Sequence, residues 1–337
     1  MRMLPRWAWH AGGWSLLLAL LLLAFSVGQF PVRPAALLQA IGWQLFGIGE
    51  PSAPAVQAAL WHIRLPRVLA AMLIGAVLSA AGAAYQAMFR NPLVSPDILG
   101  VSAGAGLGAS LGLFLGLPML LVQGIAFAGG LGAVGLVCLV AAMVRRHDPV
   151  LVLVLAGVAV SALLGAGISL LKLLADPYTQ LPSITFWLLG GLNAVVIDDL
   201  KVTAPLLLIG LLPLVLLRWR VNLLGLGDEE ASALGVAVTP LRWTLIAAAT
   251  LCTAAAVSLA GIIGWVGLVV PHIARLLVGA DFRRLLPASL LLGASFLLAA
   301  DTLARTLAPI ELPLGILTAF VGVPCFLLVL ARSERRP

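Results

Sequence analysis

The sequence carries little charge. Among its 337 residues only 10% are Asp, Glu, Lys or Arg, whereas 62% are apolar and the mean hydropathy is +1.14. Soluble globular proteins carry about 25% charged residues, so this composition excludes a soluble globular domain. Because a membrane-spanning helix needs about 20 apolar residues, the apolar content is enough for about ten spans joined by short loops.

The sequence also has few lysines and cysteines. Neither Lys172 nor Lys201 follows a glycine, so no Gly-x-x-x-x-Gly-Lys-Ser/Thr phosphate loop exists, and the chain cannot bind ATP in that manner. Cys138, Cys252 and Cys325 lie far apart inside apolar runs, which predicts neither a disulfide framework nor a zinc site. No nucleophile is paired with a base. These absences predict no catalytic residues, no metal site and no cofactor, and hence a protein that is not an enzyme.

The basic residues, 20 against 13 acidic ones, are scattered singly or in pairs between apolar runs, as topology signals are. No basic stripe with interleaved aromatic residues is present, which argues against a nucleic-acid partner and leaves the lipid bilayer as the surroundings. No chain of carboxylates lies at mid-membrane depth, whereas an ion-coupled carrier usually needs such groups. Asp301 and Arg275, which fall within or beside spans, are expected to face protein or water.

The apolar runs predict an all-α, polytopic membrane protein with ten transmembrane helices. The spans are expected at residues 14–27, 68–89, two within 98–144, 149–171, 202–217, 243–259, 264–278, 285–300 and 312–330. The four prolines between the first two spans predict a loop there. Residues 175–191, amphipathic and aromatic, suit a short helix at the membrane interface. Residues 218–242 are the most polar internal stretch and the one loop long enough to fold on its own.

The distribution of basic residues tests this count, because losing one span would invert every later loop. With a cytoplasmic N-terminus, 14 of the 20 basic residues face inside, and the other 6 face outside: Arg33, Arg64, Arg67, Lys172, Lys201 and Arg305. Cytoplasmic loops of membrane proteins carry such an excess. The asymmetry therefore favours ten spans with both termini in the cytoplasm.

An ordered series of motifs runs along the chain: Arg64-Leu65-Pro66-Arg67, Gly75-Ala76, Gly82, Gln86, Arg90-Asn91-Pro92-Leu93, Leu99-Gly100-Val101-Ser102, Leu226-Gly227-Asp228-Glu229-Glu230-Ala231, Leu234-Gly235, Pro271-His272, Asp301, Arg305 and Glu311-Leu312-Pro313-Leu314-Gly315. This series resembles the FecCD family, the membrane permeases of ABC importers for iron-siderophore, haem and cobalamin. The match covers nearly the whole chain past residue 60.

The resemblance implies one transmembrane permease domain over residues 1–337, in the inner (plasma) membrane of a bacterium. It implies a functional homodimer, in which a second copy of the chain completes a central pathway. The expected partners are two cytoplasmic ATP-binding subunits and an external substrate-binding protein. ATP hydrolysis would then reside in the partner subunits, which fits the missing phosphate loop.

The resemblance also assigns roles to residues. Arg64, Arg67 and Arg305 are expected to dock acidic residues of the binding protein, because guanidinium and carboxylate groups pair bidentately, although snorkelling to lipid headgroups is an alternative. The ATPase coupling loop is expected at Leu226, Gly227, Asp228, Glu229, Glu230, Ala231, Leu234 and Gly235. Its acidic residues favour the start of a helix, and Gly235 can end that helix. The cytoplasmic gate is expected at Asn91, Pro92 and Leu93.

The sequence alone does not specify one cargo. An iron complex, siderophore or haem, is the leading prediction, and the alternatives are cobalamin or a metal oxyanion such as molybdate carried by the same machinery. An ion-coupled secondary transporter is the remaining alternative. Residues 149–152, which begin the fifth span, are wholly apolar, so the inner-gate residues there stay undefined.

Overall fold

The computed structural model describes residues 6–28, 30–48, 50–144 and 149–333, and within them it consists of helices and loops without a strand. The helices are α1 (Arg6–Ser26), α2 (Pro34–Phe46), α3 (Pro54–Gln57), η1 (Ala58–Arg64), α4 (Leu65–Met88), η2 (Pro96–Leu99), α5 (Val101–Phe114), α6 (Met119–Met143), α7 (Pro149–Leu174), α8 (Gln180–Leu189), α9 (Ile197–Leu216), α10 (Arg218–Leu224), α11 (Asp228–Ala233), α12 (Val238–Ala260), α13 (Val266–Val278), α14 (Phe282–Ala304) and α15 (Leu314–Ser333).

The all-helical prediction is confirmed. In the described part of the chain, 7 helices are long and apolar enough to cross a membrane, and three shorter apolar helices accompany them: α5, α13 and residues Leu314–Leu328 of α15. Each of the predicted spans corresponds to one of these segments. The helix expected within residues 175–191 is α8.

The region between the first two spans was predicted as a loop, and this prediction was wrong. It contains α2, and α3 with η1 extends α4 backwards into one continuous helical segment from Pro54 to Met88. The prolines do not prevent this, because Pro34 and Pro54 occupy the first turn of their helices. Proline is tolerated there, since its missing N–H would have no partner within the helix.

Helix α4 lies at the centre of the bundle and contacts α14, α12, α13 and α9. A Cβ atom built on Gly75 would lie 2.2 Å from the Gly293 carbonyl oxygen of α14. One built on Gly82 would lie 1.8 Å from the Gly267 carbonyl oxygen of α13. Helix backbones in contact are typical of membrane bundles, where lipid gives helices no hydrophobic reason to associate and small residues allow close packing.

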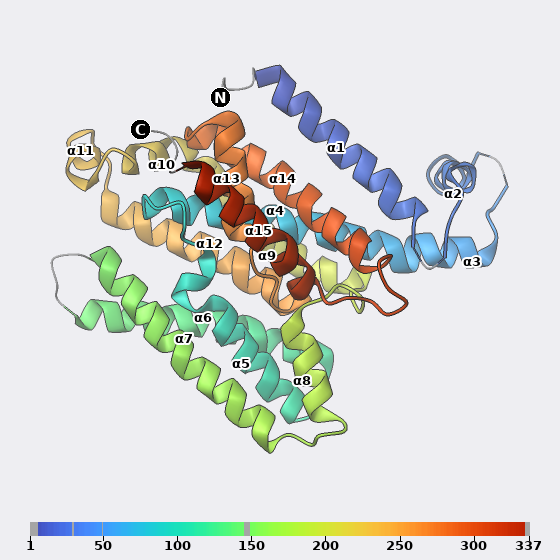
Figure 1. Ribbon diagram of the computed structural model, residues 1–337, viewed down its shortest axis with the longest axis horizontal. Helices are drawn as coiled ribbons and strands as arrows, with labels where there is room; N and C mark the ends of the chain where they lie inside the picture. The colour runs from blue at the N-terminus through green and yellow to red at the C-terminus, as the bar shows by residue number, and fades with distance from the viewer. Residues whose placement is uncertain (1–5, 29, 49, 145–148, 334–337) are drawn as a thin grey trace.

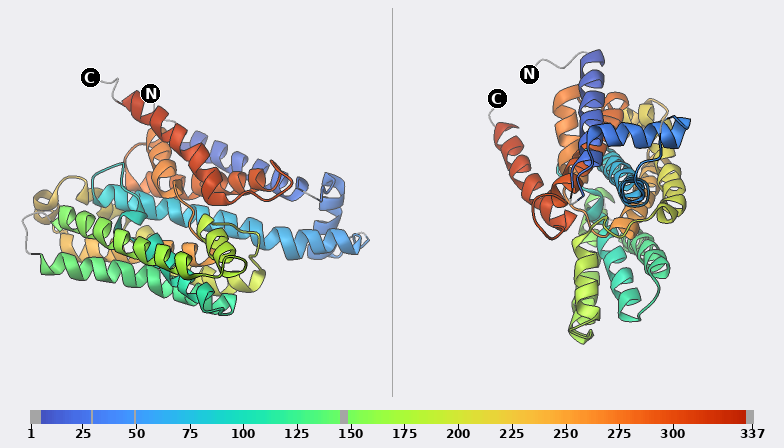
Figure 2. Two further views of the ribbon diagram at one scale, coloured as in Figure 1. Left: turned by 60° about the horizontal axis from the view of Figure 1, so that its bottom comes forward. Right: turned by 90° about the vertical axis from the view of Figure 1, so that its right-hand side faces the viewer.

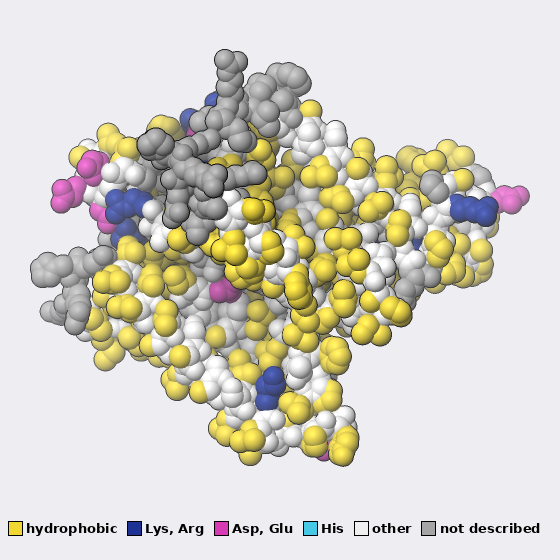
Figure 3. All heavy atoms as spheres, viewed as in Figure 1, with side chains coloured by type: hydrophobic (Ala, Val, Ile, Leu, Met, Phe, Trp, Pro, Cys, Tyr) yellow, Lys and Arg dark blue, Asp and Glu magenta, His cyan; other side chains and the backbone are white. Residues whose placement is uncertain are grey.

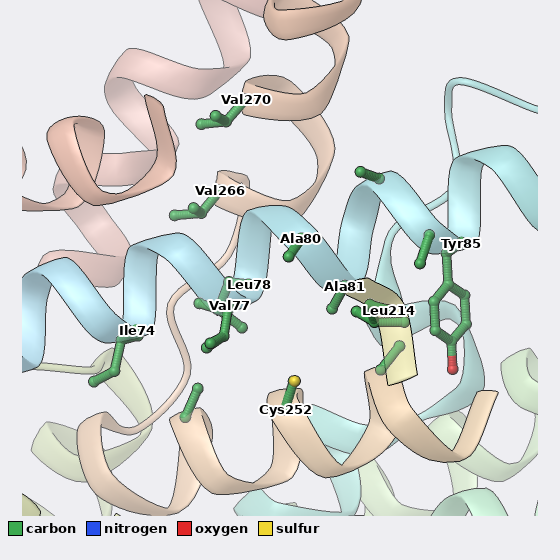
Figure 4. Close-up of a cluster of buried hydrophobic side chains, with 14 of the residues drawn as sticks. Ile74, Val77, Leu78, Ala80, Ala81, Tyr85, Leu214, Cys252, Val266 and Val270 are labelled. Carbon is green, nitrogen blue, oxygen red and sulfur yellow. The ribbon is translucent and has the colours of Figure 1, made fainter. Parts of the chain in front are cut away.

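Figure 4 shows the side chains that fill the space around α4. Small and branched residues of α4 face α13 on one side and α12 on the other. The labelled set is Ile74, Val77, Leu78, Ala80, Ala81 and Tyr85 of α4, Leu214 of α9, Cys252 of α12, and Val266 and Val270 of α13. This packing fixes the position of α4, whose two ends carry the predicted functional residues.

The bundle has two ends along its long axis (Figure 1). Helices α10 and α11 lie at one end, and α2 and α3 lie at the other, while α5, α6, α7 and α8 form a lobe along one side (Figures 1 and 2). The space-filling view shows mostly hydrophobic side chains between the ends, with charged side chains mainly at the ends (Figure 3). We call these the α11 end and the α2 end.

Candidate functional site

Four charged side chains meet at the α2 end. Arg67, in the first turn of α4, donates from Nε to Oδ1 of Asp301 at 2.7 Å and from Nη1 to both carboxylate oxygens of Glu311 at 2.9 Å. Arg305 donates from Nε to Oδ2 of Asp301 at 3.1 Å. These residues, Arg67, Asp301, Arg305 and Glu311, form what we call the ion-pair cluster. Its two positive and two negative charges balance, as charges removed from water require.

Asp301 is the centre of the ion-pair cluster. Its side chain has no exposed surface and bridges α4 to α14 by accepting from two arginines. Glu311 lies in the loop between α14 and α15 and is the most exposed member, at 36% of its side-chain surface. The cluster therefore joins three segments of the chain at one point.

Arg64 and Arg305 also hold the end of α1. The Arg64 guanidinium donates to the carbonyl oxygens of Phe25 and Phe30, and Arg305 donates from Nη2 to the Ala24 carbonyl oxygen at 3.3 Å. The turn after α1 comes close to both arginines at Gly28, whose φ of +146° favours glycine. The C-terminal end of α1 is thus tied to α4 and α14.

The three arginines predicted to dock a partner lie at the same end of the bundle, but their surroundings differ from the expectation. Arg64, Arg67 and Arg305 are only 5%, 6% and 7% exposed, and each donates hydrogen bonds within the chain. Sequence reasoning missed Glu311 as a partner of Arg67. The local signal for the pair of Asp301 and Arg305 was present, because residues four apart on a helix are neighbours. Docking through these arginines stays a prediction.

A cavity of about 380 Å³ lies beside the ion-pair cluster. Arg67 and Glu311 contribute to its wall, together with the polar side chains of Gln123, Ser183, Asn193 and Asp199. Asp199 accepts from the backbone N–H of Val196 at 3.0 Å and so closes the first turn of α9. Of the three predicted docking arginines, Arg67 is the one that lines this cavity.

Backbone hydrogen bonds join three helix ends next to the cavity. The N–H of Gly191, after α8, donates to the carbonyl of Ala260 at the end of α12 at 2.8 Å, and the N–H of Leu314 donates to the carbonyl of Gly190 at 2.9 Å. An apolar groove of about 710 Å³ shares this junction and is lined by α8, α15 and the segment between α12 and α13. The cavity beside the ion-pair cluster and the apolar groove thus meet where α8, α12 and α15 converge.

The predicted coupling loop lies at the α11 end. Helix α11 begins with Asp228, Glu229 and Glu230, all exposed, and Ala231 is its buried residue. Gly235 follows with a φ of +81°, and the Val236 N–H donates to the Ala231 carbonyl at 3.0 Å. The helical start at the acidic residues and the glycine end are therefore confirmed. Leu226 and Leu234, on either side of α11, are exposed.

Side chains fasten this loop to the bundle. Arg242 Nη2 lies 3.0 Å from Asp228 Oδ2, which ties α11 to the first turn of α12. Asn222 of α10 donates from Nδ2 to Asp281 Oδ1 at 2.8 Å and accepts from the Phe282 N–H at 2.7 Å. Partial burial opposes ionisation of Asp281, but hydrogen bonds from Arg283 and Asn222 outweigh it and lower the pKa of this carboxyl.

The predicted gate turn follows α4. The Asn91 side-chain oxygen accepts from the Leu93 N–H at 2.9 Å, which closes a tight turn ahead of η2, and Leu93 is exposed. A Cβ built on Gly227 would lie 3.7 Å from Arg90 Nη1, so the side chain of Arg90, the residue before this turn, reaches the start of α11. The sequence placed both features on one side of the membrane but gave no sign that they are neighbours.

The helices on either side of the gate turn, α4 and η2, contact neighbouring helices. A Cβ on Gly157 of α7 would lie 2.0 Å from the Ile98 carbonyl oxygen of η2. Gln86 donates to the Leu268 carbonyl at 3.0 Å and accepts from Arg275 Nη2 at 3.2 Å, so Arg275 faces protein as expected. The segments on either side of the gate turn, the end of α4 and η2, therefore contact α13 and α7, whereas Asn91 and Leu93 themselves are exposed.

Apolar helices of membrane-spanning length, with charge mainly at two ends, define a polytopic integral membrane protein. The chain belongs to the FecCD transport family, whose model matches residues 16–332. It is accordingly an ABC importer permease subunit, a non-catalytic transport component of the bacterial inner membrane. Permeases of this family work with ATPase subunits and a substrate-binding protein.

Individual relatives match over most of both chains. The chain is 43% identical over 274 residues to a probable iron chelatin transport system permease protein of Helicobacter pylori, covering 81% of this chain and 82% of the relative. It is 40% identical over 285 residues to the molybdate import system permease protein MolB of Haemophilus influenzae, covering 84% and 83%. A solved ABC transporter of the metal-chelate type, in an inward-facing conformation, superimposes with a TM-score of 0.85 at 35% identity, covering 95% of this chain and 98% of that chain.

Proposed function

We propose that two copies of this chain form the translocation pathway for an iron complex, siderophore or haem, which an external binding protein delivers and two ATP-hydrolysing subunits drive. The observation that carries the proposal is the placement of two distinct sites at opposite ends of one family-matched bundle. The ion-pair cluster and the cavity beside it lie at the α2 end. The acidic helix α11 lies at the other end, where the side chain of Arg90, next to the gate turn, reaches its start.

Ten membrane crossings with both termini in the cytoplasm are part of this proposal. The first turn of α1 and the last turn of α15 lie toward the α11 end in Figure 1, which agrees with that orientation. Helices α5 and α13 have 14 and 13 residues, so each is only about 20 Å long, less than the bilayer core of about 30 Å. Non-helical residues must complete these crossings, and backbone bonds such as Gly191 to Ala260 satisfy polar groups there.

Coupling to the ATPase is proposed to run through α11. Its exposed acidic residues and the flanking leucines offer charged and apolar contacts to a partner. Because the Arg90 side chain reaches the start of α11, a displacement of α11 would act through Arg90 on the adjoining gate turn, Asn91, Pro92 and Leu93. The backbone contact between η2 and Gly157 would carry the same movement to α7.

Docking of the binding protein is proposed at the α2 end, with Arg64, Arg67 and Arg305 as its charged residues. The dimer is proposed to form around the pathway through α7 and α15, both of which expose large apolar side chains, among them Leu155, Leu163 and Phe320. Exposed apolar surface of this kind faces either lipid or a second protein in a membrane. A crosslink between two copies of α15 would support the dimer.

The cargo is proposed from the chemistry of the pathway wall. The groove beside α15 is lined by apolar side chains, including Leu188, Ile316 and Phe320, which suit the organic shell of a chelate better than a bare ion. The relative named for molybdate, at 40% identity, is nearly as similar as the one named for an iron chelate, at 43%. A metal oxyanion therefore remains the second candidate, beside cobalamin.

Uptake assays separate these candidates. Vesicles holding the permease, its ATPase subunits and an internal ATP supply would be given the binding protein with iron-siderophore, haem, cobalamin or molybdate. We expect ATP-dependent accumulation of an iron complex and none of molybdate. Accumulation of molybdate or cobalamin alone would contradict the iron assignment, and accumulation that needs an ion gradient and not ATP would contradict the ABC mechanism.

A further inference from the structure

Glu311 differs from the other members of the ion-pair cluster in its exposure. The side chains of Arg67, Asp301 and Arg305 are 7%, 0% and 8% exposed, whereas that of Glu311 is 36% exposed. Glu311 also lines the cavity beside the cluster, together with Arg67. It is the carboxylate through which water or another molecule can reach the cluster.

The charge balance of the cluster depends on Glu311. Asp301 is shared between Arg67 and Arg305, so one negative charge serves two positive ones inside the bundle. Glu311 supplies the second negative charge, with both of its carboxylate oxygens 2.9 Å from Arg67 Nη1. If Glu311 leaves, Arg67 keeps a free donor facing the cavity and the cluster carries one net positive charge, which favours another carboxylate.

The position of Glu311 in the chain links this contact to the helices around the pathway. The loop between α14 and α15 is closed by the Leu312 N–H, which donates to the Ala304 carbonyl at 3.2 Å. Two residues later, the Leu314 N–H binds the Gly190 carbonyl at the end of α8. A movement of Glu311 therefore acts on the first turn of α15 and, through one backbone hydrogen bond, on α8.

We propose that Glu311 occupies a position on Arg67 that a carboxylate of the external binding protein takes over when that protein docks. In this exchange the incoming carboxylate replaces Glu311, and the loop between α14 and α15 is released from α4. The inference rests on the proposed function, because it needs an acidic docking partner at the α2 end. The contact of Glu311 with Arg67 is then autoinhibitory, because it competes with docking. Its release on docking would act on α15 and α8.

The test compares two variants that each remove one negative charge from the α2 end. Glu311→Gln keeps the size of the side chain but removes its charge. Asp198→Asn removes an exposed carboxylate that pairs with Lys201 at 2.6 Å, outside the ion-pair cluster. Each variant, assembled with its ATPase subunits in lipid nanodiscs, is titrated with the purified binding protein of the same importer at low and high salt.

We expect Glu311→Gln to bind the binding protein about three- to tenfold more tightly than the unmodified chain, because a competing ion pair of roughly 0.7–1.4 kcal/mol has been removed. The gain should shrink at high salt. Asp198→Asn should stay within about twofold of the unmodified chain. Unchanged or weaker binding by Glu311→Gln would overturn the exchange, since weaker binding means that Glu311 itself supports the complex.

A second measurement needs no partner. Amide hydrogen exchange in the segment from residue 305 to 314 should be faster in Glu311→Gln than in the unmodified chain, and unaffected in Asp198→Asn. If this segment exchanged in Glu311→Gln at the same rate as in Asp198→Asn and the unmodified chain, Glu311 would not restrain the loop and the proposal would be overturned. Absence of binding by every chain would contradict the proposed function and the exchange together, whereas equal binding by every chain would contradict the exchange alone.

Discussion

The two ends of the bundle hold their charges in opposite ways. At the α2 end, Arg67, Asp301 and Arg305 are buried and satisfy one another inside the chain. At the α11 end, Glu229 and Glu230 are exposed and leave their charges to solvent. A buried charge must be paired, and losing its partner is costly, whereas an exposed charge contributes little to folding. Charged residues near span ends look alike in sequence, but those at the α2 end are paired within the chain, whereas Glu229 and Glu230 at the α11 end have exposed side chains.

The largest loss of stability is expected when the ion-pair cluster at the α2 end loses its central carboxylate. Asp301→Asn leaves Arg67 and Arg305 without their shared carboxylate and should destabilise the chain by about 3–5 kcal/mol. Thermal unfolding in detergent measures the change, with Asp198→Asn as the exposed control. The double variant Asp301→Asn with Arg305→Gln removes one charge of each sign and should recover part of the loss. A stability equal to that of the control would contradict the structural role of the cluster.

The next largest loss of stability is expected where helix backbones are in contact. Gly82→Ala adds a Cβ that would lie 1.8 Å from the Gly267 carbonyl oxygen, so α4 and α13 must separate. This separation should lower the free energy of unfolding by about 1–3 kcal/mol. Gly132→Ala in α6 is the matched control, because nothing lies within 4 Å of its added methyl. The two unfolding temperatures should differ clearly. Equal values would mean that the approach of α4 to α13 is not tight.

Changes to the exposed acidic residues of α11 should alter binding to the ATPase subunits and not the stability of the fold. Glu229→Arg together with Glu230→Arg reverses two charges on α11 and should weaken association with the ATPase subunits about tenfold or more. The unfolding temperature should change little, because both side chains are exposed. Association is measured by pull-down from detergent, with Asp198→Arg at the opposite end as control. Unchanged association would count against α11 as the coupling element.

The smallest effect concerns the attachment of α10. The pKa of Asp281 is lowered in the folded chain, so its contribution to stability is present above the ordinary carboxyl pKa of about 3.9 and is lost as pH falls through the lower folded value. Asp281→Asn should therefore lower the unfolding temperature slightly at pH 7, and the difference from the unmodified chain should shrink as pH falls below the ordinary carboxyl pKa and vanish below the folded pKa. A difference that persists at low pH would show that the side chain acts through its shape and not its charge.

The sequence was informative where local patterns decide the structure. Uninterrupted apolar runs identified each long helix, and the acidic start and glycine end of α11 followed from helix capping and the helix dipole. The same local reasoning failed at α2, because prolines were taken as a sign of a loop although they also begin helices. Apolar runs and caps are properties of neighbours in sequence, and such properties can be read without a structure.

The ion-pair cluster shows what could not be read. Arg67 and Asp301 are 234 positions apart, and Arg67 and Glu311 are 244 positions apart. Their meeting depends on the packing of α4 against α14, which no local pattern specifies. The contact between Arg90 and the start of α11 has the same long-range origin. Burial of the predicted docking arginines was therefore invisible, whereas their common location at one end was not.

The most direct test of the account asks whether the chain transports without its partners. Purified permease in sealed vesicles would be compared with the same permease assembled with its ATPase subunits, ATP and the loaded binding protein. We predict cargo accumulation by the full assembly and neither accumulation nor ATP hydrolysis by the permease alone. Sustained accumulation of cargo by the isolated permease, driven by an ion gradient or by its own turnover, would contradict the account.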